Sequence, residues 1–120
     1  MSTTILIIDD EPDIVKVLSF WLEANGYEVI FSHLGREGAS LAEEKKPAVI
    51  LLDFILPDIS GSEVLDLLKV NPKVLHIPVI LMSASAESLK EEGTKSRVAE
   101  AILKPMDHKK LLESIQRYTE

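Results

Sequence analysis

The stretch Ala48–Asp58, AVILLDFILPD, constrains the fold of this chain more than any other. Its first five residues are apolar and lead directly into the carboxylate of Asp53, while Pro47 and Pro57 bound it. A continuous apolar run between breakers predicts a strand that is buried on both faces, as in a parallel sheet. Ligands bind at the carboxyl ends of such strands, so we expect Asp53 to lie at a binding edge.

Apolar strand patterns and helical patterns alternate five times along the chain. The other strands are predicted at Thr3–Ile8, Tyr27–Ser32, Pro78–Met82 and Ala101–Lys104. Helices are predicted from Pro12 to the Asn25-Gly26 cap, at Gly35–Lys46, at Gly61–Val70 and after an Asp107 N-cap. Residues 86–92 favour a short helix that Gly93 interrupts, with only Leu89 and Val98 to offer to the core.

This alternation requires right-handed crossovers and a parallel sheet that is covered on both faces. The sequence therefore predicts the α/β class, as a three-layer doubly wound (βα)5 sandwich. The expected sheet is flavodoxin-like, with strand order 2-1-3-4-5, in one domain over residues 1–120. Strands one and three are neighbours in that order, so Asp9, Asp10 and Asp53 should converge at one edge.

Three helical patterns indicate which side chains face the core. The predicted inward positions are Ile14, Val17, Leu18, Trp21 and Leu22 in the first helix, Val64, Leu65, Leu67 and Leu68 in the third, and Leu111, Leu112 and Ile115 in the last. The histidines His33, His76 and His108 show no metal-site spacing, and we expect them to be exposed polar residues.

Charge and composition exclude several function classes. The net charge of −7 argues against a partner that is a nucleic acid or an anionic membrane, because phosphates would repel the chain. The absence of cysteine excludes disulfides and thiolate chemistry. No stretch has the length and apolarity of a membrane span or a signal peptide, so a cytoplasmic location is expected.

Four predicted strands end in residues that suit phosphoryl chemistry. These residues are Asp9-Asp10, Asp53, Ser83 and Lys104, and any one of them alone reads as a helix start, a cap or a turn. Together, oxygen ligands suited to Mg²⁺ would lie beside an ammonium and a hydroxyl. Asp53, in the middle, would be the nucleophile that forms an aspartyl phosphate.

The chain resembles the receiver domains of two-component response regulators over essentially its whole length. The motifs that carry the resemblance are LIIDDEPDI, LLDFILPDISG, PVILMSA and LKP. For the metal, the resemblance implies that Asp10 and Asp53 bind Mg²⁺ directly, with the main-chain carbonyl of Ile55 as a third ligand. It also implies that Asp9 acts through a metal-bound water.

For the phosphoryl group, the resemblance implies that Asp53 accepts it from a phosphohistidine on a sensor histidine kinase or a phosphotransferase. Lys104 would pair with the phosphoryl group, and the hydroxyl of Ser83 and the main-chain N–H of Ala84 would donate to it. The Lys104–Pro105 peptide bond would be cis. A switch in protein–protein contacts with a downstream output protein or domain would follow, and homodimerisation on phosphorylation is one form that it could take.

The sequence departs from the family pattern at two places near its end. Receivers usually carry Tyr or Phe three positions before the lysine of the Lys-Pro pair, whereas this chain has Ala101. They also usually carry a Gly-Ala turn just before the fifth strand, whereas here that segment reads SRVAEA and Gly93 comes earlier. We therefore expect the signal to appear as a rearrangement of residues 83–100. A phosphate-independent pseudo-receiver is an alternative. A phosphatase with an aspartyl-phosphate intermediate is disfavoured, because Ile55 cannot act as its acid, and a nucleotide binder is disfavoured because no glycine-rich loop follows the first strand.

Overall fold

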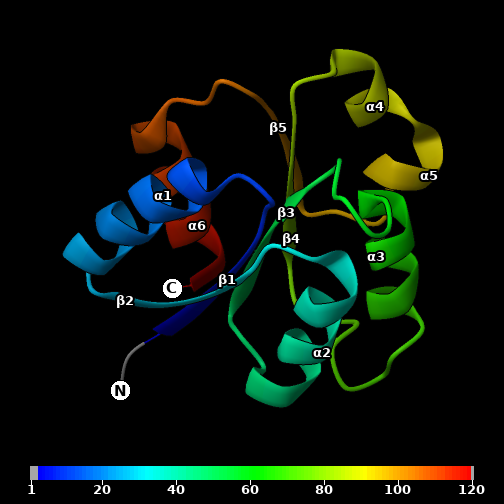
Figure 1. The fold of residues 1–120 in the computed structure, drawn as a ribbon, viewed down its shortest axis with the longest axis horizontal. Coiled ribbons are helices and arrows are strands. Elements are labelled where there is room, and N and C mark those ends of the chain that lie inside the picture. The colour runs from blue at the N-terminus through cyan, green and yellow to red at the C-terminus, as the bar shows by residue number, and fades with distance from the viewer. Residues whose placement is uncertain (1–2, 120) are drawn as a thin grey trace.

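The computed structural model describes residues 3–119, which form one parallel sheet with helices on both faces (Figure 1). The strand order β2-β1-β3-β4-β5 confirms the predicted 2-1-3-4-5 arrangement. The strands are β1 (Thr3–Ile8), β2 (Tyr27–Ser32), β3 (Val49–Asp53), β4 (Val79–Ser83) and β5 (Glu100–Leu103). The helices are α1 (Pro12–Ala24), α2 (Gly35–Lys45), α3 (Gly61–Lys69), α4 (Ala86–Lys90), α5 (Glu92–Lys95) and α6 (His108–Thr119).

Alternate residues of the central strands enter two separate cores, because successive side chains of a strand point to opposite faces. Helices α1 and α6 cover one face, and α2 and α3 cover the other (Figure 1). In β3, Val49 and Leu51 pack toward α1 and α6, while Ile50 and Leu52 pack toward α2 and α3. All residues of β3 and β4 are buried, which confirms the strand predicted from the apolar run.

The predicted apolar stripe of α1 is displaced around the helix. Val15, Leu18 and Leu22 are buried, whereas Val17 is 48% exposed. Both sets of positions have helical spacing, but Val17 lines a pocket with Met106 and His108 and is not part of the core. The expectation for Val17 is therefore wrong. Leu67 of α3 is likewise 40% exposed and was wrongly placed in the core.

Local sequence signals set the ends of the helices. Pro12 begins α1, and Gly26, with a φ of +89°, follows its C-cap Asn25. Ser60 and Glu63 form a reciprocal capping box at the start of α3. Within residues 3–119, no helix has the length and apolarity needed to cross a membrane.

Two short helices occupy the segment that gave the weakest sequence signal. The α4 helix ends at Lys90 and α5 begins at Glu92, so the break comes before Gly93. Leu89 and Val98 pack against the core as expected, and Thr94 is also buried. Arg97 fastens the segment after α5 to α3, since its guanidinium binds Asp66 and Ser62.

Candidate functional site

The candidate site lies at the carboxyl ends of β1 and β3. The register of this strand pair sets Ile8 beside Leu52, so the residues that follow, Asp9 and Asp53, lie next to each other. Asp9 is completely buried, and Asp53 is only 6% exposed. A parallel sheet places two acidic side chains together here because the strands that carry them are neighbours.

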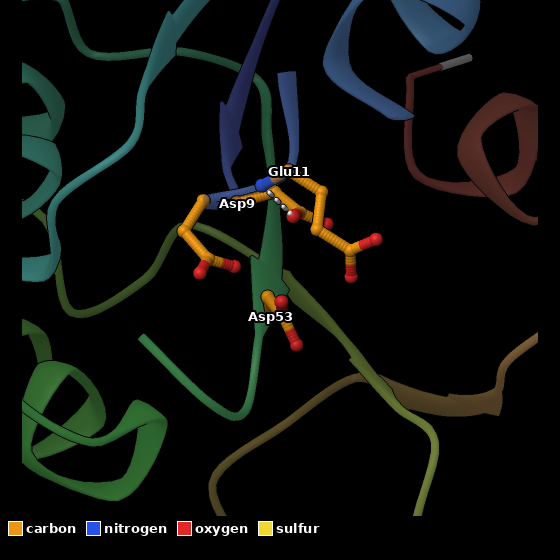
Figure 2. Close-up of side chains that lie close together, drawn as sticks. Asp9, Glu11 and Asp53 are labelled. Atoms are coloured by element: carbon orange, nitrogen blue, oxygen red, sulfur yellow. Dashed lines mark hydrogen bonds between the residues drawn. The ribbon is translucent and has the colours of Figure 1, made fainter. Parts of the chain in front are cut away.

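Four carboxylates gather at this edge of the sheet. Asp9, Asp10, Glu11 and Asp53 each offer one oxygen atom, and these oxygens lie within 4.8 Å of one another. Figure 2 shows Asp9, Glu11 and Asp53 gathered at the ends of β1 and β3, with the main-chain N–H of Glu11 donating to Asp9 Oδ1 at 2.9 Å. The predicted convergence of the three aspartates is therefore confirmed.

Glu11 is a member of the site that was not predicted from the sequence. An acidic residue directly before a helix suits the helix N-terminus, but Glu11, the N-cap residue of α1, makes no capping hydrogen bond with its side chain. Its carboxylate lies instead 3.5 Å from Lys104 Nζ. Pro12 was the available signal, because a proline at the first helical position places the preceding residue at the junction of strand and helix.

Lys104 joins the carboxylates from the end of β5. Its Nζ donates to Asp9 Oδ2 at 3.0 Å and lies 3.3 Å from Asp53 Oδ2, and its side chain is only 11% exposed. Burial lowers the pKa of Lys104, but hydrogen bonds and charge from Asp9 and Asp53 outweigh it and raise that pKa above its ordinary value. Lys104 is therefore held as an ammonium between the two buried carboxylates.

The electrostatics of the site disfavour a charged Asp53. Burial, followed by the negative charge of Asp9, raises the pKa of Asp53 from 3.8 to about 6, although Lys104 and the N–H of Ile55 act in the opposite direction. One ammonium faces four carboxylates, so the cluster has excess negative charge. An all-oxygen donor set with excess negative charge fits a hard divalent cation such as Mg²⁺, which would offset the repulsion that raises this pKa.

The last residue of β4, Ser83, and the residue after it, Ala84, complete the rim of the site. Ser83 is buried, its main-chain oxygen accepts from Lys104 N at 2.8 Å, and its Oγ accepts from Ser85 N at 3.0 Å. Ala84 is exposed and lines a pocket of about 520 Å³ together with Glu11 and Lys104. The peptide bond between Lys104 and Pro105 is cis.

The loop after β3 packs closely against the end of the strand that carries Asp53. Ile55 N donates to Asp53 Oδ1 at 3.3 Å, while the Ile55 side chain is 65% exposed. Gly61 N donates to Phe54 O, and a Cβ atom on Gly61 would lie 2.7 Å from Phe54 Cα. Only glycine therefore allows α3 to begin this close to the strand that carries Asp53.

The histidines differ from their predicted exposure. His33 is half-buried, and its Nδ1 lies 2.9 Å from the main-chain oxygen of Asp9, so it contacts the main chain of a residue of the site. His108 is also half-buried, and its ring centroid lies 5.6 Å from that of Trp21. Only His76 is exposed as expected. The sheet order and the packing of α6 on α1 create these contacts, which no local spacing indicates.

Comparison with known proteins identifies the class that this fold and this acidic site define. A family model described as "Response regulator receiver domain" matches residues 5–116. The chain therefore belongs to the response regulator receiver domain family, whose members are signalling proteins of two-component systems and not classical enzymes. The resemblance drawn from the sequence motifs is confirmed.

Particular relatives cover the chain almost completely. The "Polar-differentiation response regulator DivK" of Brucella ovis is 37% identical over 119 residues, which are 98% of this chain and 97% of the relative. The chemotaxis response regulator CheY4 of Vibrio cholerae shares the fold, with a TM-score of 0.89, 24% identity and coverage of 98% and 99%. So does the receiver domain of the sensor histidine kinase PA1611 of Pseudomonas aeruginosa, with a TM-score of 0.89, 24% identity, coverage of 98% and 98%, and a magnesium ion in its active-site cleft.

Proposed function

We propose that Asp53 is the phosphoryl acceptor of this receiver domain. The observation that carries the proposal is the placement of Asp53, at the end of a central strand, 3.3 Å from Lys104 Nζ and beside the completely buried Asp9. The donor is a phosphohistidine of a sensor histidine kinase or a phosphotransferase, which is the partner that a two-component receiver requires.

The residues at the ends of β1 and β3 fit Mg²⁺ as the cofactor of this reaction. We assign Asp10, Asp53 and the main-chain carbonyl of Ile55 as its direct ligands, and Asp9 as a ligand through water. The likeness to the PA1611 receiver, which holds a magnesium ion, supports this assignment. When bound, Mg²⁺ supplies charge neutralisation for the carboxylates and the phosphoryl oxygens.

In the transfer step, a carboxylate oxygen of Asp53 forms a bond to phosphorus while the bond from phosphorus to the histidine nitrogen breaks. The imidazole leaves with that electron pair and takes up a proton. Lys104 offsets the charge on the phosphoryl oxygens, and the hydroxyl of Ser83 and the N–H of Ala84 donate to them. The same groups act in the later hydrolysis of the aspartyl phosphate.

We further propose that the phosphoryl signal reaches a partner through residues 83–100. Ser83 Oγ accepts from Ser85 N, and Ser85 Oγ in turn accepts from Ser88 N, which caps α4. A hydroxyl that turns toward the phosphoryl group gives up its bond to Ser85 and loosens this cap. Ala101 is exposed on β5 and has no ring to turn inward, so α4 and α5 carry the change to an output protein, or to a second receiver in a phosphorylation-dependent dimer.

The acceptor is tested by intact-mass measurement after treatment with acetyl phosphate, with Mg²⁺ and with EDTA. We expect one Mg²⁺-dependent phosphoryl adduct on the wild type and none on Asp53→Asn. Asp58→Asn is the matched control, because Asp58 lies in the loop after β3 but outside the acidic cluster, and it should keep the adduct. A folded wild-type protein that takes no adduct with Mg²⁺ would refute the proposal and favour a phosphate-independent pseudo-receiver.

The route of the signal is tested by amide hydrogen exchange with and without the phosphoryl mimic beryllofluoride. We expect exchange to change in residues 83–100 more than in α2 or α6. Identical exchange in that segment, on protein that demonstrably binds the mimic, would contradict the proposed route.

A further inference from the structure

A groove between α1 and β2 exposes two aromatic side chains. Phe20 on α1 is 74% exposed and Phe31 on β2 is 50% exposed, and both line a groove of about 440 Å³. Helix α1 lies beside β2, at the edge of the sheet (Figure 1). A contiguous exposed apolar patch with polar residues at its rim is typical of a protein–protein contact site. We call this surface the α1–β2 groove.

Two charges of opposite sign flank Phe20 along α1. Lys16 and Glu23 are exposed, both line the α1–β2 groove, and neither makes an ion pair with any side chain that the structure describes. They are seven positions apart, which is about 10 Å along a helix. Phe20 lies between them, four positions after Lys16 and three before Glu23.

This order of charges is self-complementary under a two-fold axis. When two α1 helices pack antiparallel with the axis near Ser19 and Phe20, Lys16 of each copy faces Glu23 of the other. The two Phe20 rings then meet at the centre, as an isologous interface requires. Each chain carries a net charge of −7, so two copies repel each other over most of their surfaces. Lys16 and Glu23 give the α1–β2 groove one charge of each sign, so this repulsion is smaller there.

We propose that the α1–β2 groove is a homodimer interface, in which Phe20 of each copy packs on the groove of the other and two Lys16–Glu23 ion pairs close its ends. A second copy of this chain fits better than an acidic or a basic partner, because the groove carries one charge of each sign around an apolar centre. The phosphoryl chemistry of Asp53 is not involved, so this dimer forms in the unmodified protein.

The test is sedimentation equilibrium of the unmodified chain from micromolar to millimolar concentration. We expect the mass to rise from the monomer value of 13.3 kDa toward twice that value. Phe20→Ser should weaken the dimer by at least about tenfold in Kd. Val70→Ser is the matched control, because Val70 is a similarly exposed apolar residue, at 78%, outside the α1–β2 groove, and it should dimerise like the wild type.

Charge reversal distinguishes this interface from any other. Lys16→Glu and Glu23→Lys should each weaken the dimer by about tenfold in Kd, because each substitution sets like charges together twice. The double variant should return to within about threefold of the wild type. A wild-type protein that stays monomeric at millimolar concentration, a dimer indifferent to Phe20→Ser, or a double variant no tighter than the single ones would overturn the proposal.

Discussion

Replacing Asp53 by asparagine is expected to stabilise the metal-free protein at neutral pH, even though it removes the proposed phosphoryl acceptor. Asp53 lies beside Asp9, and both carboxylates share the ammonium of Lys104. Burial and the charge of Asp9 raise the pKa of Asp53 from 3.8 to about 6. The ionised side chain is therefore less stable in the folded protein than in the unfolded chain.

The size of the effect follows from this pKa. A tenfold change in an acidity constant corresponds to about 1.4 kcal/mol, so a pKa of about 6 in place of 3.8 makes ionised Asp53 cost the folded state about 2–3 kcal/mol. The pKa already contains the favourable effect of Lys104, and an asparagine oxygen can still accept from Ile55 N. We expect Asp53→Asn to raise the free energy of unfolding by about 2 kcal/mol in EDTA at about pH 7.5.

The pH dependence gives the sign of the effect. Because the pKa of Asp53 is higher in the folded protein, its protonated form stabilises the fold fully below about pH 4, and this contribution is lost as the pH rises through about 6. The advantage of the asparagine variant should therefore be near zero at about pH 4 and constant above about pH 7. Urea unfolding followed by circular dichroism, in EDTA across this pH range, measures it.

Asp58, in the loop that follows β3, provides a control with an effect of opposite sign. Hydrogen bonds from the N–H groups of Arg36 and Gly35 hold the pKa of Asp58 below its ordinary value. Its contribution is present above the unfolded pKa and lost as the pH falls through the depressed one, so Asp58→Asn should destabilise the protein at neutral pH. The reasoning about Asp53 fails if Asp53→Asn is less stable than the wild type at neutral pH, or if its gain is the same at both ends of the pH range.

Three other substitutions test the site and its supports. Lys104→Met leaves the buried Asp9 without its counter-charge and should lower the free energy of unfolding by about 3 kcal/mol in EDTA. A loss of less than about 1 kcal/mol in urea unfolding would contradict the inference that Asp9 and Asp53 share the Lys104 ammonium. Gly61→Ala places a Cβ against the main chain of Phe54 and should lower the free energy of unfolding by about 1–3 kcal/mol in the same assay. An unchanged free energy of unfolding would show that the loop after β3 moves to make room for the Cβ. Arg97→Met releases the segment before β5 from α3 and should speed amide exchange in residues 86–98, whereas unchanged exchange there would show that the ion pair is not needed to hold it.

Much of the fold could be predicted because local signals and topological rules agree. The buried run before Asp53 and four further apolar runs gave the strands, and breakers such as Pro12 and Gly26 gave the helix ends to within a few residues. The prediction of core residues failed in α1, where two different sets of apolar residues both have helical spacing. Val15 and Val17 both fit a period of 3.6 residues, and only the position of α1 over the sheet decides that Val15 is buried and Val17 is exposed.

Site residues at the ends of strands were predicted from the sequence. Site residues whose position depends on where a long side chain extends were missed. Asp9 and Lys104 each follow a strand and Asp53 is the last residue of one, so the sheet order alone brings them to one edge. Glu11 lies beyond the strand, and its approach to Lys104 depends on where α1 turns away. His33 reaches the carbonyl of Asp9 only because β2 lies beside β1.

By itself, the sequence determined the order of the elements, the parallel sheet and the four strand ends that carry polar groups, because periodicity and breakers act within a few residues. The tertiary structure decided how one ammonium is shared among carboxylates, and it decided that Phe20 and Phe31 line one groove. These features depend on residues far apart in the chain, whose separations are fixed only when helices pack on the sheet. Long-range packing sets the charges and surfaces of this receiver, while local patterns set its framework.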